Sequence, residues 1–170
     1  MIVVVHDANI LIDLYETNLL TSFFRMGFAS HSTDLVLYEI EQPICLYVQN
    51  GQIQQHTLTP EQLGQVAQIQ TTIGRSVSFP DCSVLWLMQK LGNSAILLTG
   101  DNKLRQCAED SGVTVHGMLW ILDQLVEKKI VSAREMIGKL EKLLVLGSRL
   151  PKEECQKRIA AWKKAIQATS

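Results

Sequence analysis

The sequence has few of the features that mark secreted, membrane-spanning or zinc-finger proteins. Its four cysteines are widely spread without a CxxC pair, which excludes a disulfide framework and a zinc knuckle and favours free thiols in the cytoplasm. No apolar stretch approaches the ~20 residues needed to cross a bilayer, so no membrane association is expected. The chain opens on MIVVVHD, without the basic leader of a secretory signal.

Several catalytic signatures are also missing. The four histidines show neither HxH nor HExxH spacing and are interpreted as structural. Gly100-Asp101-Asn102-Lys103 lacks the pattern of a phosphate-binding loop, and Cys82 has no visible base partner that would make it a nucleophile. With 46% hydrophobic and 19% charged residues over 170 positions, the chain is too apolar to be disordered and suits one domain of ordinary size.

Charge is unevenly distributed along the chain. Residues 1–127 carry 5 basic and 13 acidic side chains, whereas residues 128–170 carry 11 basic and 4 acidic ones. Two interpretations remain open. The basic residues can simply occupy the solvated faces of two C-terminal helices. Alternatively, they offer a surface to a polyanion such as RNA or DNA, while some of the carboxylates gather around a cation.

Short apolar runs alternate with helical patterns, which predicts an α/β fold with a mainly parallel sheet. Strands are predicted at residues 2–5, 35–37, 53–58, 95–99 and 113–115. Helices are predicted at 8–20 with a break near Thr17-Asn18, and at 60–72, 80–90, 101–110, 118–128, 133–146 and 152–167. Thr59-Pro60-Glu61-Gln62 has the pattern of a capping box, and Leu91-Gly92-Asn93 is expected to end a helix.

Four acidic residues fall where parallel sheets bind ligands, at the carboxyl ends of the strands. Asp7 and Asp101 come directly after predicted strands, and Glu39 lies at the end of another. Asp81 lies in the first turn of the helix that precedes the strand at 95–99, so it belongs to the same edge. Four carboxylates from distant segments are therefore expected on one rim.

Clustered carboxylates repel one another, and a bound cation relieves that repulsion. Oxygen ligands suit Mg²⁺ or Mn²⁺, and such ions support phosphodiester hydrolysis by a metal-activated water. A structural alternative stays open, because Asp7, Asp81 and Asp101 each lie near a helix start, where aspartate is favoured as a cap.

The motifs around these acids resemble those of the PIN-domain family of metal-dependent nucleases. The matching stretches begin with a strand, Asp7, a small residue and Asn9, and end with a run from the strand at 95–99 through Asp101, Lys103 and Arg105 to Gly117. In sequence letters they are VVHDANILID (4–13), LVLYEI (35–40), FPDCSV (79–84) and AILLTGDNKLR (95–105).

The resemblance implies a three-layer α/β/α sandwich with a five-stranded sheet over residues 1–127. Residues 128–170 lie outside the matching motifs, and their pattern predicts a basic helical C-terminal extension. It assigns Asp7, Glu39, Asp81 and Asp101 as metal ligands, with Asn9 supporting the site by hydrogen bonding. Glu41 is an alternative to Glu39 if the predicted register of the strand is wrong. Lys103 and Arg105 follow Asp101 and either hold substrate phosphates or face solvent.

The sequence thus predicts a Mg²⁺- or Mn²⁺-dependent endoribonuclease, with DNA as the alternative substrate, in which no side chain attacks covalently. The resemblance alone implies the toxin of a toxin–antitoxin pair, with an antitoxin protein as partner, and a homodimer. The alternative is a non-catalytic RNA- or protein-binding module on a PIN-like scaffold, with the carboxylates serving as caps.

Overall fold

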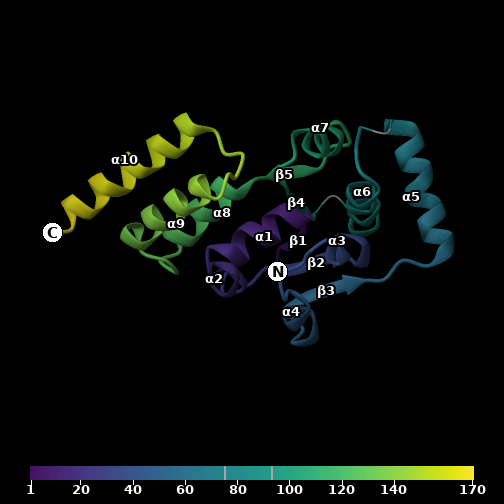
Figure 1. Ribbon diagram of the computed structural model, residues 1–170, viewed down its shortest axis with the longest axis horizontal. Coiled ribbons are helices and arrows are strands. Elements are labelled where there is room, and N and C mark those ends of the chain that lie inside the picture. The colour runs from purple at the N-terminus through teal and green to yellow at the C-terminus, as the bar shows by residue number, and fades with distance from the viewer. Residues whose placement is uncertain (75, 93) are drawn as a thin grey trace.

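Five short strands form a single sheet in which every strand pair is parallel (Figure 1). The computed structural model describes residues 1–74, 76–92 and 94–170. The strands are β1 (Val3–His6), β2 (Ala29–Thr33), β3 (Ile53–His56), β4 (Ile96–Leu98) and β5 (Thr114–His116). Their order across the sheet is β3-β2-β1-β4-β5, and the predicted five-stranded parallel sheet is confirmed.

Helices cover both faces of the sheet, so the predicted three-layer sandwich is also confirmed (Figure 1). Val4 of β1 packs with α1, α2, α8 and α9, whereas the next residue, Val5, packs on the other face with α5, α6 and α7. The helices are α1 (Ala8–Glu16), α2 (Leu20–Phe24), α3 (Asp34–Tyr38), α4 (Cys45–Gln49), α5 (Pro60–Ile73), α6 (Phe79–Leu91), α7 (Asn102–Asp110), α8 (Met118–Glu127), α9 (Ala133–Val145) and α10 (Lys152–Ala168). This alternation of faces along β1 follows from the two-residue period of a strand.

Local sequence signals set the helix boundaries that frame the sheet. Thr59 and Gln62 form the predicted capping box at the start of α5. The hydroxyl of Ser78 caps α6 by accepting a hydrogen bond from the Asp81 N–H at 3.1 Å. Gly92 ends α6 with φ of 82°, a left-handed conformation that favours glycine. Asn93, which was also predicted to belong to the end of this helix, lies outside the described residues.

The predicted strand at residues 35–37 is wrong, because these residues belong to the short helix α3. The hydroxyl of Thr33 caps this helix by accepting a hydrogen bond from the Val36 N–H at 3.3 Å. The strand of this region is β2, whose Ser30 and Ser32 are buried although they are polar. Strand prediction favours apolar and β-branched residues. It therefore missed the polar strand β2 and placed a strand at the apolar residues 35–37 instead.

The connections near the N-terminus differ less from the prediction. The chain breaks after α1 as expected: Asn18 adopts a left-handed φ of 56°, and α2 begins at Leu20. Helix α4 was not predicted. It ends at Gln49 with Asn50 as its C-cap, and Gly51 follows with a left-handed φ of 74°. The predicted strands at 95–99 and 113–115 shorten and shift to the bounds of β4 and β5.

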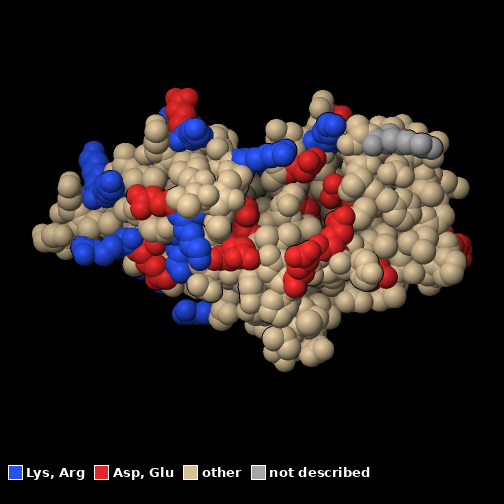
Figure 2. Space-filling model, viewed as in Figure 1, with Lys and Arg blue, Asp and Glu red and all other residues tan. Residues whose placement is uncertain are grey.

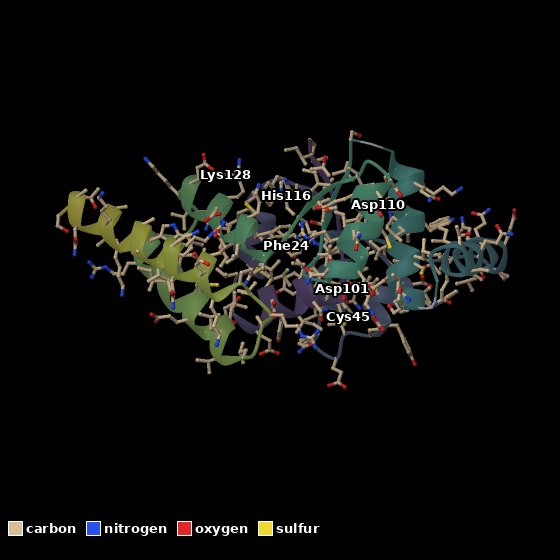
Figure 3. The ribbon with its side chains drawn as sticks, turned by 90° about the horizontal axis from the view of Figure 1, so that it is seen from above. Phe24, Cys45, Asp101, Asp110, His116 and Lys128 are labelled. Atoms are coloured by element: carbon tan, nitrogen blue, oxygen red, sulfur yellow. The ribbon has the colours of Figure 1, made fainter. Side chains whose placement is uncertain are left out.

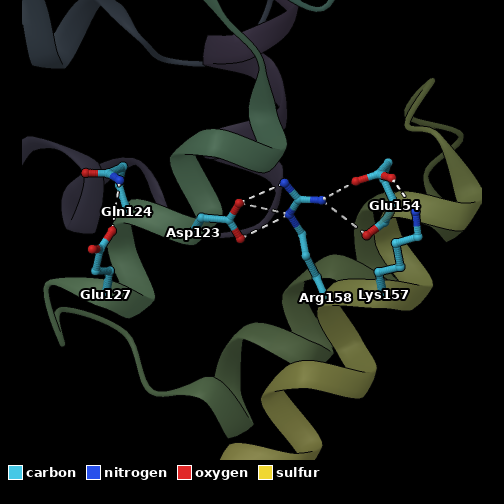
Figure 4. A network of polar contacts seen from close by, with 6 residues as sticks. All are labelled: Asp123, Gln124, Glu127, Glu154, Lys157 and Arg158. Carbon is cyan, nitrogen blue, oxygen red and sulfur yellow. Dashed lines mark hydrogen bonds and ion pairs between the residues drawn. The ribbon is translucent and has the colours of Figure 1, made fainter.

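The C-terminal helices share a hydrophobic cluster with the sheet. Leu140 of α9 and Trp162 of α10 belong to the same buried cluster as Val4 of β1. A polar network also ties α10 to α8, because the guanidinium of Arg158 donates to both carboxylate oxygens of Asp123 at 2.9 and 3.0 Å (Figure 4). Glu154 pairs with Arg158 at 3.2 Å, and hydrogen bonds from Lys157 and Arg158 lower the pKa of the Glu154 carboxyl.

Surface charge separates along the molecule. Most of the Lys and Arg side chains visible in Figure 2 lie on the part of the molecule formed by the C-terminal helices, where some Asp and Glu lie among them, and further Asp and Glu lie in the middle of this face. Part of the basic charge is neutralised locally, as in the ion pairs of Lys139 with Glu135 and of Lys157 with Glu153. Among the described residues, no helix has the length and apolar composition that crossing a membrane requires.

Truncation of Trp162 tests whether α10 is part of the same cooperative unit as the sheet. We expect Trp162→Ala to lower the free energy of unfolding by about 3 kcal/mol, because it opens a cavity in the shared cluster. The exposed Lys164→Ala serves as the control and should change stability by no more than about 0.5 kcal/mol. Denaturant titration followed by circular dichroism measures both. A separate early transition for α10 would contradict a single unit.

Candidate functional site

Two acidic residues lie at the point where the strand order reverses. The chain builds β2 and β3 on one side of β1 and adds β4 and β5 on the other, so the switch point lies between β1 and β4. Asp7 comes directly after β1, and Asp101 follows β4 after only Thr99 and Gly100. Ligands of parallel sheets bind at such a point, beyond the carboxyl ends of the strands.

Asp7 is buried, with 2% of its surface exposed, and all its hydrogen bonds serve to position it. One carboxylate oxygen caps α1 by accepting from the Ile10 N–H at 2.8 Å. The other accepts from the Thr99 hydroxyl and from the Gly100 N–H at 3.3 Å. Burial raises the pKa of Asp7 from 3.8 to about 6, although these hydrogen bonds lower it in part.

Thr99 connects the two acids of the switch point. Its hydroxyl donates to Asp7 and accepts a hydrogen bond from the Asp101 N–H at 3.0 Å. Asp101 in turn caps α7, because its carboxylate accepts from the Leu104 N–H at 2.8 Å. The sequence analysis assigned no role to Thr99. The available signal was its place between a buried strand and the Gly100-Asp101 turn, where a hydroxyl can bond on both sides.

Asp81 lies in the first turn of α6 and is partly buried. Burial and the charge of Asp101 raise the pKa of its carboxyl, against a hydrogen bond from Ser78 that lowers it. The charge of Asp81 in turn raises the pKa of Asp7 and of Glu39. The charge effects therefore run from Asp81 to Asp7 and Glu39, and from Asp101 to Asp81.

Glu39 lies at the C-terminal end of α3, one short helix beyond β2. Its side chain is exposed, and partial burial together with the charge of Asp81 raises the pKa of its carboxyl. Glu41, the alternative candidate, lines a different groove with Tyr38 and Pro43. The helix that replaced the predicted strand therefore still directs Glu39 toward the rim.

The structure places Asp7 and Asp101 just after β1 and β4, Asp81 in the first turn of α6, and Glu39 at the end of α3. Within residues 1–74, 76–92 and 94–170, no three His, Cys, Asp or Glu side chains are gathered closely enough to hold an ion. Burial raises the pKa of Asp7 and of Glu39, and the charge of Asp81 raises both further. A divalent cation relieves such repulsion, and carboxylate oxygens are the donors that Mg²⁺ and Mn²⁺ prefer. The donor chemistry therefore fits such an ion.

A pocket of about 350 Å³ adjoins this rim. Asp101 lines it together with Asn9 and Asp13 of α1, and the chain between α9 and α10 forms the opposite wall. The structure thus places the predicted supporting residue, Asn9, on an exposed part of α1 that faces the pocket. Asp13 accepts a hydrogen bond from the Ser148 hydroxyl at 2.9 Å, and burial raises its pKa.

The two basic residues that follow Asp101 have different surroundings. Lys103 is exposed on the first turn of α7. The guanidinium of Arg105 instead donates to the carbonyl oxygen of Thr99 at 3.2 Å and pairs with Glu109 at 3.5 Å. A side chain at Gly117 would meet this guanidinium at 3.1 Å, so Arg105 fills the space between β4 and the turn before α8.

The histidines contribute no metal-binding group at the rim. His6 precedes Asp7 but is fully buried against Phe23, with ring centroids 5.3 Å apart, and burial lowers its pKa to about 3. His31 and His56 contact each other on adjacent strands, with Nδ1 and Nε2 2.8 Å apart.

Burial also raises the pKa of the Cys82 thiol to about 11, which keeps it protonated and unsuited to nucleophilic attack.

The fold and the rim together define an α/β protein with an acidic site at the switch point of a parallel sheet. The DUF3368 family model, described as a PIN domain, matches residues 3–164. The chain therefore belongs to the PIN-domain family, as its motifs predicted. Proteins of this family are generally nucleases that use divalent metal ions. A search of curated proteins found no match to the chain.

The raised pKa of Asp7 predicts how stability depends on pH. The unfolded chain releases this proton near pH 3.8 and the folded chain near pH 6, so ionised Asp7 lowers stability as pH rises through this window. The loss above pH 6 is on the order of 3 kcal/mol. Without metal, Asp7→Asn should therefore have a higher Tm than the wild type at pH 8 and a similar one at pH 4.

Metal addition completes this test at pH 8. Mg²⁺ or Mn²⁺ at ten times its Kd should stabilise the wild type by about 1.4 kcal/mol, because the ion binds only the folded chain. Asp7→Asn should respond much less, since it lacks one of the carboxylates. Thermal unfolding with and without EDTA measures both effects. Equal metal-induced shifts in the two proteins would exclude Asp7 as a ligand.

Proposed function

We propose that this protein is a metal-dependent endoribonuclease that hydrolyses phosphodiester bonds by attack of an activated water. The observation that carries the proposal is the position of Asp81, whose carboxylate interacts electrostatically with Asp7, Glu39 and Asp101. Asp81 thereby influences acids from two other segments and is itself influenced by Asp101, which follows β4 at the switch point of the sheet. Such a group is costly without a cation and suits one well.

In the proposed mechanism, Asp7, Glu39, Asp81 and Asp101 hold one or two Mg²⁺ or Mn²⁺ ions. Such an ion, when bound, supplies a Lewis acid for the phosphoryl oxygens and lowers the pKa of a water. Ile10, Thr99 and Gly100 hold the Asp7 carboxylate in a fixed position at the end of β1.

Two cationic groups have different parts in this mechanism. Lys103, exposed beside Asp101, contacts a substrate phosphate. The guanidinium of Arg105 bonds to the Thr99 carbonyl and so positions Thr99 rather than the substrate. In this assignment only the first of the two predicted substrate-binding residues touches RNA.

The biological setting belongs to the same proposal and rests on the family. We place the protein in the cytoplasm as the toxin of a toxin–antitoxin pair, with an antitoxin protein as its partner and a homodimer as its assembly. The four cysteines are free, which suits a reducing compartment. RNA is favoured over DNA as substrate by the resemblance alone, so both polymers belong in the first assay.

Removal of Asp81 tests the nuclease. We expect Asp81→Asn to reduce Mg²⁺-dependent cleavage of a structured RNA on the order of 100-fold or more, because a bound ion supplies several kcal/mol of charge stabilisation. Asp110→Asn is the matched control: Asp110 is exposed and lies at the opposite end of α7 from Asp101 (Figure 3). Its activity should remain within about twofold of the wild type.

The assay compares RNA with single-stranded DNA in Mg²⁺, in Mn²⁺ and in EDTA, with product formation followed on a gel. Cleavage that persists in EDTA, or that Asp81→Asn leaves unchanged, would overturn the proposal. Preference for DNA would correct the substrate and leave the rest of the mechanism intact.

The second candidate function is a non-catalytic RNA-binding module, favoured by the basic surface over α8, α9 and α10 in Figure 2. Lys152, Lys163 and Lys164 of α10 are exposed. If this surface alone recognises RNA, the triple substitution of these lysines by Ala should weaken RNA binding about tenfold or more and make it less salt-dependent. Filter binding at two salt concentrations measures this. Metal-dependent cleavage by the wild type would decide against the module as the whole function.

A further inference from the structure

A groove of about 430 Å³ lies between the start of α9 and the end of α10. The last turn of α8 and the connection from α8 to α9 form the rest of its lining. The end of α10 lies far from the sheet in Figure 1, and none of the four candidate metal ligands lines the groove. The groove is therefore separate from the acidic site.

Small side chains leave this groove open. Trp162 of α10 belongs to the same buried cluster as Met136 of α9, so a large side chain fills the space between the helices at that level. Further along, Ala165 of α10 and Ala133 of α9 line the groove, and both have short side chains. The aliphatic lining consists of Val126, Val131, Ala133, Ala165 and Ile166, with the hydroxyls of Ser132 and Thr169 beside it. An aliphatic side chain from outside would bury apolar surface here.

Two cations border this aliphatic lining. Lys129 and Arg134 line the groove, and both are exposed. Neither forms an ion pair with a carboxylate of the described residues, whereas the neighbouring Glu135 pairs with Lys139. Glu127, at the end of α8, accepts a hydrogen bond from Gln124 instead. The two cations at the groove are therefore available to an anionic partner.

Lys129 occupies a backbone position that suits glycine better. Its φ is 56°, in the left-handed region. Its N–H donates to the Val126 carbonyl at 3.0 Å, and the Ile130 N–H donates to the Leu125 carbonyl at 3.0 Å. This is the hydrogen-bond pattern of a helix end at which glycine is usual. A lysine here is strained and supplies a charge that glycine would lack.

An aliphatic lining bordered by cations matches a peptide segment that carries apolar side chains next to carboxylates. Amphipathic segments bind grooves in this way, with apolar anchors in the groove. Complementary charges around the anchors add specificity and speed association. Among the described residues, no aromatic side chain lines this groove, whereas single-stranded RNA is typically bound by stacking its bases on aromatic rings. The lining therefore favours a peptide over RNA.

We propose that this groove binds an acidic amphipathic segment of a partner protein. An aliphatic side chain of the partner packs on the groove lining, and the partner's carboxylates contact Lys129 and Arg134. The inference goes beyond the proposed function and does not depend on it, because no residue of the candidate metal site takes part. It assigns the C-terminal helices a role in protein recognition.

Binding of a synthetic peptide tests the proposal on the full chain. The labelled probe carries leucines at helical spacing between glutamates, and fluorescence anisotropy gives its Kd. We expect Lys129→Gly combined with Arg134→Ala to weaken binding about tenfold, because two charges beside the groove are lost. The Tm should not fall, because glycine suits the left-handed position. Ala165→Glu should also weaken binding about tenfold or more, because it places a carboxylate in the groove.

The matched control is Arg149→Ala combined with Lys152→Ala. It removes the same charge from two exposed residues beside the start of α10, at the opposite end of that helix from the groove. It should change the Kd by less than about twofold. Two further peptides replace either the glutamates by glutamine or the leucines by serine. Each should bind the wild type about tenfold more weakly than the first peptide.

Four results would overturn the proposal. Equal losses in the groove variant and the control would mean that only net charge matters. Equal binding of all three peptides, or binding of none, would reject the peptide chemistry. An unstructured oligoribonucleotide that displaces the peptide and depends equally on Lys129 and Arg134 would assign the groove to RNA. A wild-type dimer that Ala165→Glu converts to a monomer in analytical ultracentrifugation would assign it to a second copy of the chain.

Discussion

The structure depends most on the buried carboxylate of Asp7. It caps α1, accepts the hydroxyl of Thr99 and bonds to the N–H of Gly100, so one side chain fastens the central strand to the first helix and to the exit of β4. Burial makes its negative charge unfavourable, as the pKa of about 6 indicates. A group that holds two segments together at such a cost is typical of a functional site, where stability is given up for chemistry.

The sequence was sufficient for the fold wherever local signals agreed with burial. The run before Asp7, the capping box at Thr59 and the apolar strand before Asp101 each satisfied several rules at once. β2 could not be recognised, because Ser30 and Ser32 are polar residues buried by their neighbours. Residues 35–37 were predicted as a strand because they are apolar, but three apolar residues also suit one turn of a helix, which is what the structure shows.

The candidate site, like the fold, could be predicted only in part. The order of strands and helices predicted Asp7 and Asp101 at the carboxyl ends of parallel strands, and the structure places them just after β1 and β4. Glu39 was predicted from a strand at 35–37 that is instead helix α3. The role of Thr99 required coordinates, since a hydroxyl between two acids has no spacing signature. The position of residues 146–150 beside the pocket could not be predicted from the sequence, because no local signal indicates that this connection packs against α1. Its hydrogen bond joins Ser148 to Asp13 across most of the chain.

The order of strands also determines when the site can exist during synthesis. The two strands β1 and β2 are close in the sequence, so both are available for pairing early in synthesis. The other neighbour of β1 is β4, which begins only at Ile96. The hydrogen bonds of Asp7 with Thr99 and Gly100 can therefore form only after these two residues have been synthesised. Residues 146–150, which line the pocket beside Asp101, are synthesised later still. Chains fold from the N-terminus as they are made. The candidate site therefore has all of its residues only after most of the chain has been synthesised.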